Sequence, residues 1–113
     1  MTVQEYLDGQ PAEFHATYQA VLTALHDIGD IVIDPVSIGI LVKRRGTFCE
    51  LRPRNSAVEL SFKLNDEVRH PRIRRRVKAS VHRTAHFVWL GSPDEVDDQV
   101  RAWLAEAWLA SPV

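Results

Sequence analysis

The sequence has few of the features that would tie it to a disulfide framework or a membrane. Its 113 residues contain one cysteine, Cys49, which cannot form an internal disulfide. No stretch approaches the roughly 18–20 apolar residues that a membrane-spanning helix needs. Met1 to Gln10 lacks the basic and apolar segments of a secretory signal. We therefore expect a cytoplasmic protein without a membrane partner.

Motifs for metal, nucleotide or covalent chemistry are also missing. The chain has no Cys-x-x-Cys, His-Glu-x-x-His, Gly-x-Ser-x-Gly or glycine-rich phosphate loop. His82 and His86 are four residues apart, which on a strand is about 13 Å. One zinc ion binds nitrogens at only about 2 Å, so this pair is too far apart to share it. We expect no metal, no cofactor and no catalytic residue.

Lysine and arginine are absent from residues 1–42, which carry six acidic side chains. Thirteen of the fourteen basic residues lie between Lys43 and Arg83, together with four acids, so this basic window has a net charge of +9. Residues 84–113 hold five acids and Arg101. The total charge of −1 conceals this separation. Charge asymmetry of this kind bears on partners rather than on fold.

Hydrophobic periodicity predicts helices at both ends of a single domain, residues 1–113. Apolar residues recur at three- and four-residue spacing from Pro11 to Ile28 and again after Ser92. Gly29 is placed to end the first helix in the left-handed conformation. Ser92 is the predicted N-cap of the second helix, with Glu95 completing a capping box.

Between the helices the period changes to two, which is typical of strands with one polar face. We predict strands over residues 36–42, 47–52, 57–64 and 84–90. Residues 74–81 form either a short strand or a basic loop. Helix, strands, helix is the order of an α+β domain. We expect an antiparallel sheet of four to five strands, with the N-terminal and C-terminal amphipathic helices packed on one face.

Several segments resemble one known family. They are Lys43 to Pro53, the alternating strand Val58 to Leu64, Pro71 to Ile73, His86, Ser92 to Asp98, and Ala107-Trp108, where many relatives have Ala-Tyr. The chain is similar over about Tyr6 to Trp108 to a bacterial family, domain of unknown function 5655. Some members are labelled predicted transport proteins. The resemblance implies this architecture and no established activity.

The basic window suggests a surface for an anionic partner. We select Arg44, Arg45, Arg74, Arg75 and Arg76 as candidate anion-binding residues, because arginine suits bidentate recognition of phosphate and carboxylate. The partner would be an anionic small ligand, a nucleic acid or an acidic protein. A near-zero total charge and strands without interleaved exposed aromatic residues weigh against nucleic acid. The alternatives are a solvated strand edge and pairing with acids of the flanking helices.

Other side chains have structural explanations. His86 is expected to be a partly buried, hydrogen-bonded residue or one wall of a small pocket. Cys49 is expected to be a buried apolar residue, although neighbouring arginines could activate it. The spacing of Trp89, Trp103 and Trp108 favours core packing over a ligand cage.

Three functions follow from these observations. The first is a non-enzymatic binding module with an arginine-rich surface. The second is self-association as a homodimer, since acidic helices and a basic sheet are complementary. The third is a small enzyme that uses His86 and an arginine.

Overall fold

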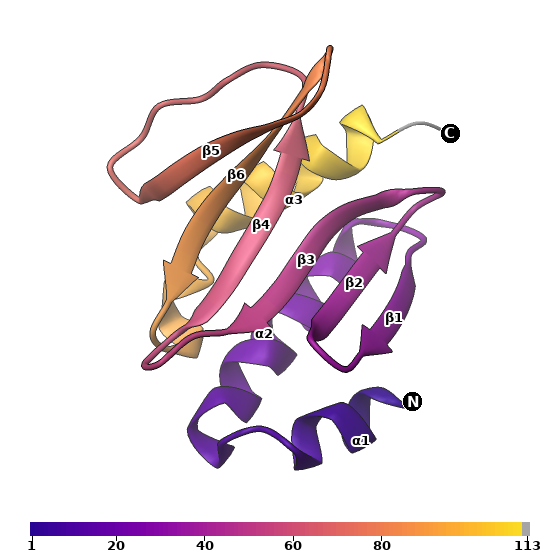
Figure 1. Ribbon diagram of the computed structural model, residues 1–113, viewed down its shortest axis with the longest axis vertical. Helices are drawn as coiled ribbons and strands as arrows, with labels where there is room; N and C mark the ends of the chain where they lie inside the picture. Colours follow the sequence, from indigo (N-terminus) through magenta and orange to yellow (C-terminus); the bar gives the residue numbers. More distant parts are fainter. Residues whose placement is uncertain (112–113) are drawn as a thin grey trace.

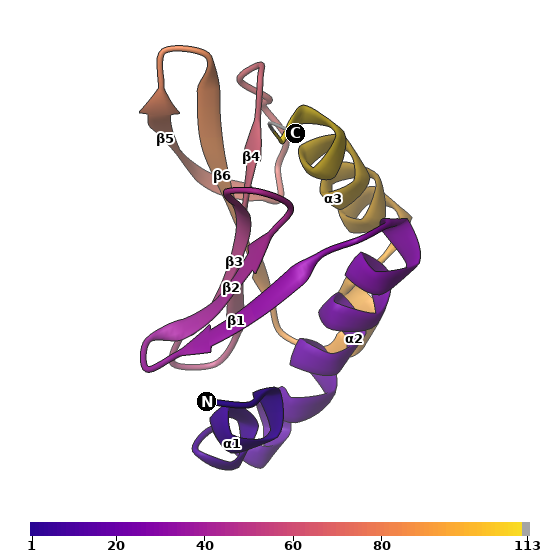
Figure 2. The same ribbon diagram turned by 90° about the vertical axis from the view of Figure 1, so that its right-hand side faces the viewer.

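The computed structural model describes residues 1–111, which form a layer of helices on one face of a six-stranded sheet (Figures 1 and 2). The elements are α1 (Val3–Asp8), α2 (Ala12–Ile28), β1 (Val32–Val36), β2 (Gly39–Lys43), β3 (Thr47–Pro53), β4 (Val58–Leu64), β5 (Ile73–Ser80), β6 (Arg83–Leu90), a 3-10 turn (Pro93–Glu95) and α3 (Asp98–Ala110). The α+β class is confirmed. The sheet has six strands rather than the expected four to five.

The strands lie in the order β1-β2-β3-β4-β6-β5, and every neighbouring pair is antiparallel. Most connections are hairpins, and only β5 breaks the sequential order by pairing on the far side of β6. The segment from Arg74 onward, left open between strand and loop, is therefore an edge strand. Figure 2 shows that α2 and α3 cover one face of the sheet while the other face carries no element.

The first predicted strand is wrong in its extent. A continuous strand over residues 36–42 does not form, because Ser37 and Ile38 make a turn between β1 and β2. Val36 pairs with Gly39 across this turn. Gly39 packs against the backbone of β3, where a Cβ atom would overlap the Leu51 carbonyl oxygen. The strand β1 on the N-terminal side of this turn was not predicted, because the alternation pattern alone does not reveal it.

The short helix α1 was not predicted either. Its capping box is complete: the Glu5 N–H donates to Thr2 Oγ1 at 3.1 Å, and the Thr2 N–H donates to Glu5 Oε1 at 3.0 Å. Tyr6 of α1 is buried, and its hydroxyl lies 2.8 Å from that of Tyr18 in α2. Burial of the two phenols raises their pKa values.

Helix α2 begins and ends close to the predicted residues, but its C-terminus differs. Gly29 has φ 166° and ψ −166°, which is extended backbone rather than the expected left-handed conformation. The glycine is needed for space instead, because the ring of Trp108 packs directly over its Cα. Trp108 also donates from Nε1 to the Asp30 carbonyl at 3.0 Å. The turn after α2 is thereby fixed to the end of α3.

The second predicted helix begins later than its sequence suggests. Ser92 makes no side-chain cap, and the residues after it form one 3-10 turn that ends at Val96. The N-cap of α3 is Asp97, whose Oδ1 accepts from the Val100 N–H at 3.1 Å. The predicted capping box of Ser92 and Glu95 is therefore wrong.

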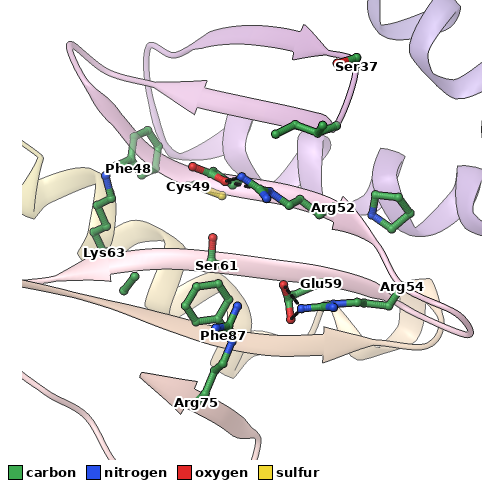
Figure 3. A pocket seen from close by; sticks show the side chains of 14 residues that line it. Ser37, Phe48, Cys49, Arg52, Arg54, Glu59, Ser61, Lys63, Arg75 and Phe87 are labelled. Atoms are coloured by element: carbon green, nitrogen blue, oxygen red, sulfur yellow. Dashed lines mark hydrogen bonds and ion pairs between the residues drawn. The ribbon is translucent and has the colours of Figure 1, made fainter. Parts of the chain in front are cut away.

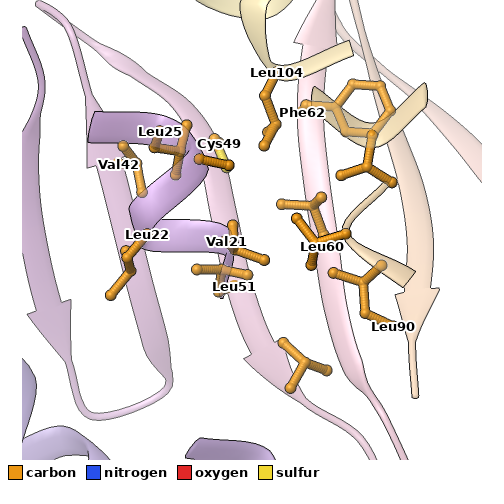
Figure 4. Packing of buried hydrophobic residues seen from close by; sticks show 14 of the residues in the cluster. Val21, Leu22, Leu25, Val42, Cys49, Leu51, Leu60, Phe62, Leu90 and Leu104 are labelled. Atoms are coloured by element: carbon orange, nitrogen blue, oxygen red, sulfur yellow. The ribbon is translucent and has the colours of Figure 1, made fainter. Parts of the chain in front are cut away.

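The core lies between the sheet and the helices (Figure 4). Val21, Leu22 and Leu25 of α2 and Leu104 of α3 point toward the sheet, which contributes alternate residues from β2, β3, β4 and β6. Most of these side chains are fully buried, and each contributes about 1.5–3 kcal/mol through the hydrophobic effect. The predicted alternation of β4 is confirmed.

Candidate functional site

The face of the sheet opposite the helices, here called the open face, presents the other half of each alternating strand. Its rows follow from the strand register. Glu50, Ser61, Phe87 and Arg75 lie in one row across β3, β4, β6 and β5. Strands are spaced by about 4.8 Å, so these four side chains project as close neighbours. Polar and charged groups from four strands are thus collected on one surface.

This surface is hollowed by a depression of about 580 Å³ (Figure 3). Its lining residues are Ser37, Ile38, Phe48, Cys49, Glu50, Arg52, Pro53, Arg54, Glu59, Ser61, Lys63, Arg75, Ala85 and Phe87. The small side chain of Ala85 lies beside Lys63 in the register and leaves room between Lys63 and Phe87. A volume of this size falls in the range of small-molecule sites, about 300–1,000 Å³.

Two carboxylates of the depression are already paired. Glu59 is only 5% exposed, and Arg54 Nη2 donates to both of its oxygens at 3.0 and 2.9 Å. The indole Nε1 of Trp89 donates to the same carboxylate at 3.0 Å. Arg52 contacts Glu50 with Nη2 to Oε2 at 3.0 Å. These two arginines neutralise the acids of the depression and leave its other cations uncompensated.

The uncompensated cations are Lys63 and Arg75, with Arg74 beside them. None of the three has an acidic partner within residues 1–111. The guanidinium of Arg75 lies 4.0 Å from the centroid of Phe87, and that of Arg74 lies 3.8 Å from the centroid of Trp89. Lys63 Nζ donates to a backbone carbonyl at 3.1 Å. The aromatic rings hold the arginines in place without cancelling their charge.

The five predicted anion-binding arginines do not converge on one surface. Arg74 and Arg75 lie over aromatic rings of the open face. Arg76 lies opposite His86 in the register of β5 and β6, and the His86 side chain faces the helices. The Nε of Arg76 contacts Glu67 at 2.9 Å. Of the three consecutive arginines of β5, two therefore lie on the open face and one lies on the opposite side of the sheet.

The remaining two predicted arginines lie away from the depression. Arg44 stacks 3.7 Å from the ring centroid of Trp108 and donates to the Trp108 carbonyl at 3.0 Å. This contact places a cation at the C-terminus of α3, where it complements the helix dipole. Arg45 is exposed in the turn between β2 and β3.

His86 is fully buried on the helix side of the sheet. Its ring stacks on Phe62 with a centroid distance of 5.7 Å, and the Val68 N–H donates to Nε2 at 2.9 Å. Burial is the main cause that lowers the pKa of His86, and the Arg76 guanidinium acts in the same direction. The hydrogen bond from Val68 makes Nε2 an acceptor, and the ring does not line the depression on the open face. It anchors the segment between β4 and β5.

Cys49 is 1% exposed and packs in the core, and burial raises the pKa of its thiol (Figure 4). A protonated, buried thiol is a poor nucleophile. Within the part of the chain that the structure describes, no three His, Cys, Asp or Glu side chains are grouped to hold a metal ion. None of the helices in residues 1–111 has the length and hydropathy needed to cross a bilayer.

The aromatic residues differ from expectation in one respect. Trp103 is buried in the core as predicted, whereas Trp89 is 38% exposed on the open face. Core packing of Trp89 is therefore wrong, because it shares the face of Glu59 in the register. Phe87 and Trp89 are aromatic residues of an open sheet face, next to the arginines of β5. The period-two alternation of β6 was the signal that could have placed them there.

Comparison with known proteins identifies a family. No curated protein and no solved structure matches the chain significantly. The model of the family described as Domain of unknown function (DUF5655) matches residues 3–111. This match extends from α1 to the end of α3 and thus includes every strand of the sheet. The chain therefore belongs to the family of domains of unknown function 5655.

Proposed function

We propose that this domain is a non-enzymatic binding module whose open face binds an anionic partner. The binding residues are Lys63, which lies opposite Ala85 in the register, and Arg75, which lies opposite Phe87, with Arg74 next to Arg75. Ser61 adds a hydroxyl at the centre of the depression. The observation that carries the proposal is the pair of uncompensated cations in the depression, whose other charges are already matched.

The chemistry of these residues suits an anion. A phosphate or carboxylate group that binds above Ala85 would draw on the Lys63 ammonium, which now donates to the Thr47 carbonyl, and on the Arg75 guanidinium over Phe87. Hydrogen bonds to ionised groups are shorter and about twice as strong as neutral ones. Because Arg75 rests on Phe87, its side chain is already partly ordered and loses less entropy on binding.

Several basic residues elsewhere in the domain are already paired with carboxylates, which supports the choice of the open face. Arg72 contacts Asp97 at 2.8 Å, and Arg76 contacts Glu67 at 2.9 Å. Lys43 contacts Asp34 at 3.0 Å. An anion that bound at any of these positions would compete with a carboxylate of the same molecule. Lys63 and Arg75 offer a site without that competition.

A binding role is favoured over catalysis by the burial of the candidate catalytic groups. His86 has no exposed surface, and Cys49 lies in the core. General acid–base catalysis requires a group within hydrogen-bond reach of the substrate, at about 2.6–3.2 Å. Ser61 is in the depression, but no histidine or cysteine side chain that could activate it is exposed beside it.

The test is charge reversal measured by calorimetry, with inorganic pyrophosphate as the probe at low ionic strength. Lys63→Glu and Arg75→Glu are each expected to weaken binding about tenfold or more, since a hydrogen bond to a charged group contributes roughly 1.5–3 kcal/mol. Arg45→Glu is the matched control, because it makes the same charge change on an exposed turn outside the depression. Equal losses in all three variants, or no binding by the parent protein, would contradict the proposal.

A further inference from the structure

The charged groups of the depression come from several strands. Its uncompensated cations are Lys63 of β4, whose ammonium reaches the Thr47 carbonyl of β3, and Arg75 of β5, whereas the carboxylate of Glu50 belongs to β3. Ser61 stands between them, opposite Glu50 on one side and Phe87 on the other. A ligand that fills the depression therefore meets the cations of Lys63 and Arg75 and the carboxylate of Glu50, which Arg52 contacts on one oxygen only.

The carboxylate of Glu50 has one oxygen that is free to accept a hydrogen bond. Arg52 contacts only Oε2 of Glu50, and no donor within residues 1–111 contacts Oε1. The Glu50 side chain is 29% exposed, so Oε1 can accept from a ligand. An ionised carboxylate accepts hydrogen bonds and cannot donate them, so the group it selects is a donor such as a hydroxyl. Ser61 can donate or accept beside it.

A nucleic-acid strand does not suit this surface. Strand binding needs a continuous cationic track and exposed aromatic faces on which bases stack. The faces of Phe87 and Trp89 are already covered by Arg75 and Arg74. On the side of Glu50, a second phosphate would have to compete with the Glu50 carboxylate for Arg52. An acidic peptide would meet the same competition, and it offers few hydroxyl donors.

We infer that the ligand is a small polyhydroxylated monophosphate, of the size of a sugar phosphate. Its phosphate lies between Lys63 and Arg75 above Ala85, and its hydroxyls bind Ser61 and Glu50 Oε1. This inference rests on the proposed function and names the ligand class of the same site. The depression of about 580 Å³ accommodates such a molecule, since small-molecule sites measure about 300–1,000 Å³.

The test compares five probes by calorimetry: ribose 5-phosphate, inorganic phosphate, ribose, a single-stranded oligonucleotide and a polyglutamate peptide. Ribose 5-phosphate is expected to bind about tenfold more tightly than inorganic phosphate, since each added hydrogen bond to a charged group contributes roughly 1.5–3 kcal/mol. Glu50→Gln should weaken the sugar phosphate while inorganic phosphate binds equally or more tightly. Asp66→Asn is the control, an exposed acid outside the depression that should change neither affinity.

The outcomes separate the two proposals. Equal affinity for ribose 5-phosphate and inorganic phosphate, or loss of both to the same extent in Glu50→Gln, overturns the ligand class and leaves anion binding intact. If the oligonucleotide or the peptide binds more tightly than ribose 5-phosphate and Lys63→Glu weakens that binding, the ligand class is likewise overturned and anion binding is left intact. No binding of any anionic probe overturns both.

Discussion

The buried ring of His86 links the stability of the domain to pH. Folding lowers the pKa of His86 from its ordinary value of 6.5, mainly through burial and also through Arg76, although the backbone of Thr84 and Phe62 and the Glu67 carboxylate act in the opposite direction. As the pH falls through 6.5, the unfolded chain takes up this proton at a higher pH than the folded chain does. The free energy of unfolding must therefore fall as the pH falls through this value.

Urea unfolding between about pH 5 and 7 measures this effect, in a range where few other side chains titrate. We expect the parent protein to lose stability as the pH falls, and His86→Gln to show a much flatter profile even where it is less stable overall. His82→Gln, in the exposed turn between β5 and β6, should keep the parent profile. The same slope in His86→Gln as in the parent would contradict this explanation.

Gly39 is constrained by space rather than by backbone conformation. No glycine within residues 1–111 adopts the left-handed conformation, but a Cβ atom at Gly39 would overlap the Leu51 carbonyl oxygen. Gly39→Ala is expected to cost about 1–3 kcal/mol, the usual range for overpacking. Gly46→Ala is the matched control, since nothing lies within 4 Å of its added methyl group. Chemical denaturation compares the two; equal stability of both variants would show that β2 can shift away from β3.

At the scale of elements, the start of α3 depends on one carboxylate. Asp97 caps the helix through the Val100 N–H and contacts Arg72 at 2.8 Å, and both interactions lower its pKa. Asp97→Ala is expected to lower the free energy of unfolding by about 1–2 kcal/mol through loss of the cap. Asp94→Ala, in the preceding 3-10 turn, should change it by less than about 0.5 kcal/mol. A larger loss of thermal stability in Asp94→Ala than in Asp97→Ala would contradict this assignment.

Long periodic elements could be predicted from the sequence, and short or irregular ones could not. The apolar stripes of α2 and α3 and the alternation of β4 and β6 reflect burial against a common core. The six residues of α1 are too few to show a helical period, so only its Thr2 and Glu5 capping box marked it. The β1–β2 turn contains Ile38, an apolar residue that fits a strand equally well.

The candidate site was predicted only in part, because it depends on strand register. Arg75 was among the predicted residues, but Lys63 and Ser61 were not. Their proximity follows from the pairing of β4 with β6 and of β6 with β5, which local sequence does not encode. A bulge between Ile73 and Arg75 brings consecutive arginines of β5 over aromatic rings of β6. Strict alternation would have separated them.

At the scale of the whole molecule, the basic window is only partly neutralised. Five of its ten arginines contact a carboxylate within the described residues: Arg52, Arg54, Arg69, Arg72 and Arg76. Their partners are mainly acids of the window itself, and only Arg72 reaches the acidic C-terminal part. Within the described residues, few ion pairs therefore cancel the charge separation of the sequence: Lys43 contacts Asp34, and Arg72 contacts Glu95 and Asp97.

This separation keeps self-association as the alternative proposal, although both sheet edges oppose direct strand pairing. The edge strand β1 contains Pro35, and the edge strand β5 is bulged and rich in arginine and lysine. Such features are typical of edges that are protected from pairing. Light scattering at low and high salt tests the alternative: we expect a monomer throughout, and a dimer that dissociates with salt would favour association of the charged faces.

The most direct test of the central claim, that the open face binds anions, is a titration followed by backbone amide NMR, with inorganic pyrophosphate at low ionic strength. We predict saturable shifts centred on Ser61, Lys63, Arg75, Ala85 and Phe87, and their loss in Lys63→Glu. Shifts centred on Arg44 and Arg45, shifts spread evenly over the basic window, or no saturable shifts at all would contradict the account.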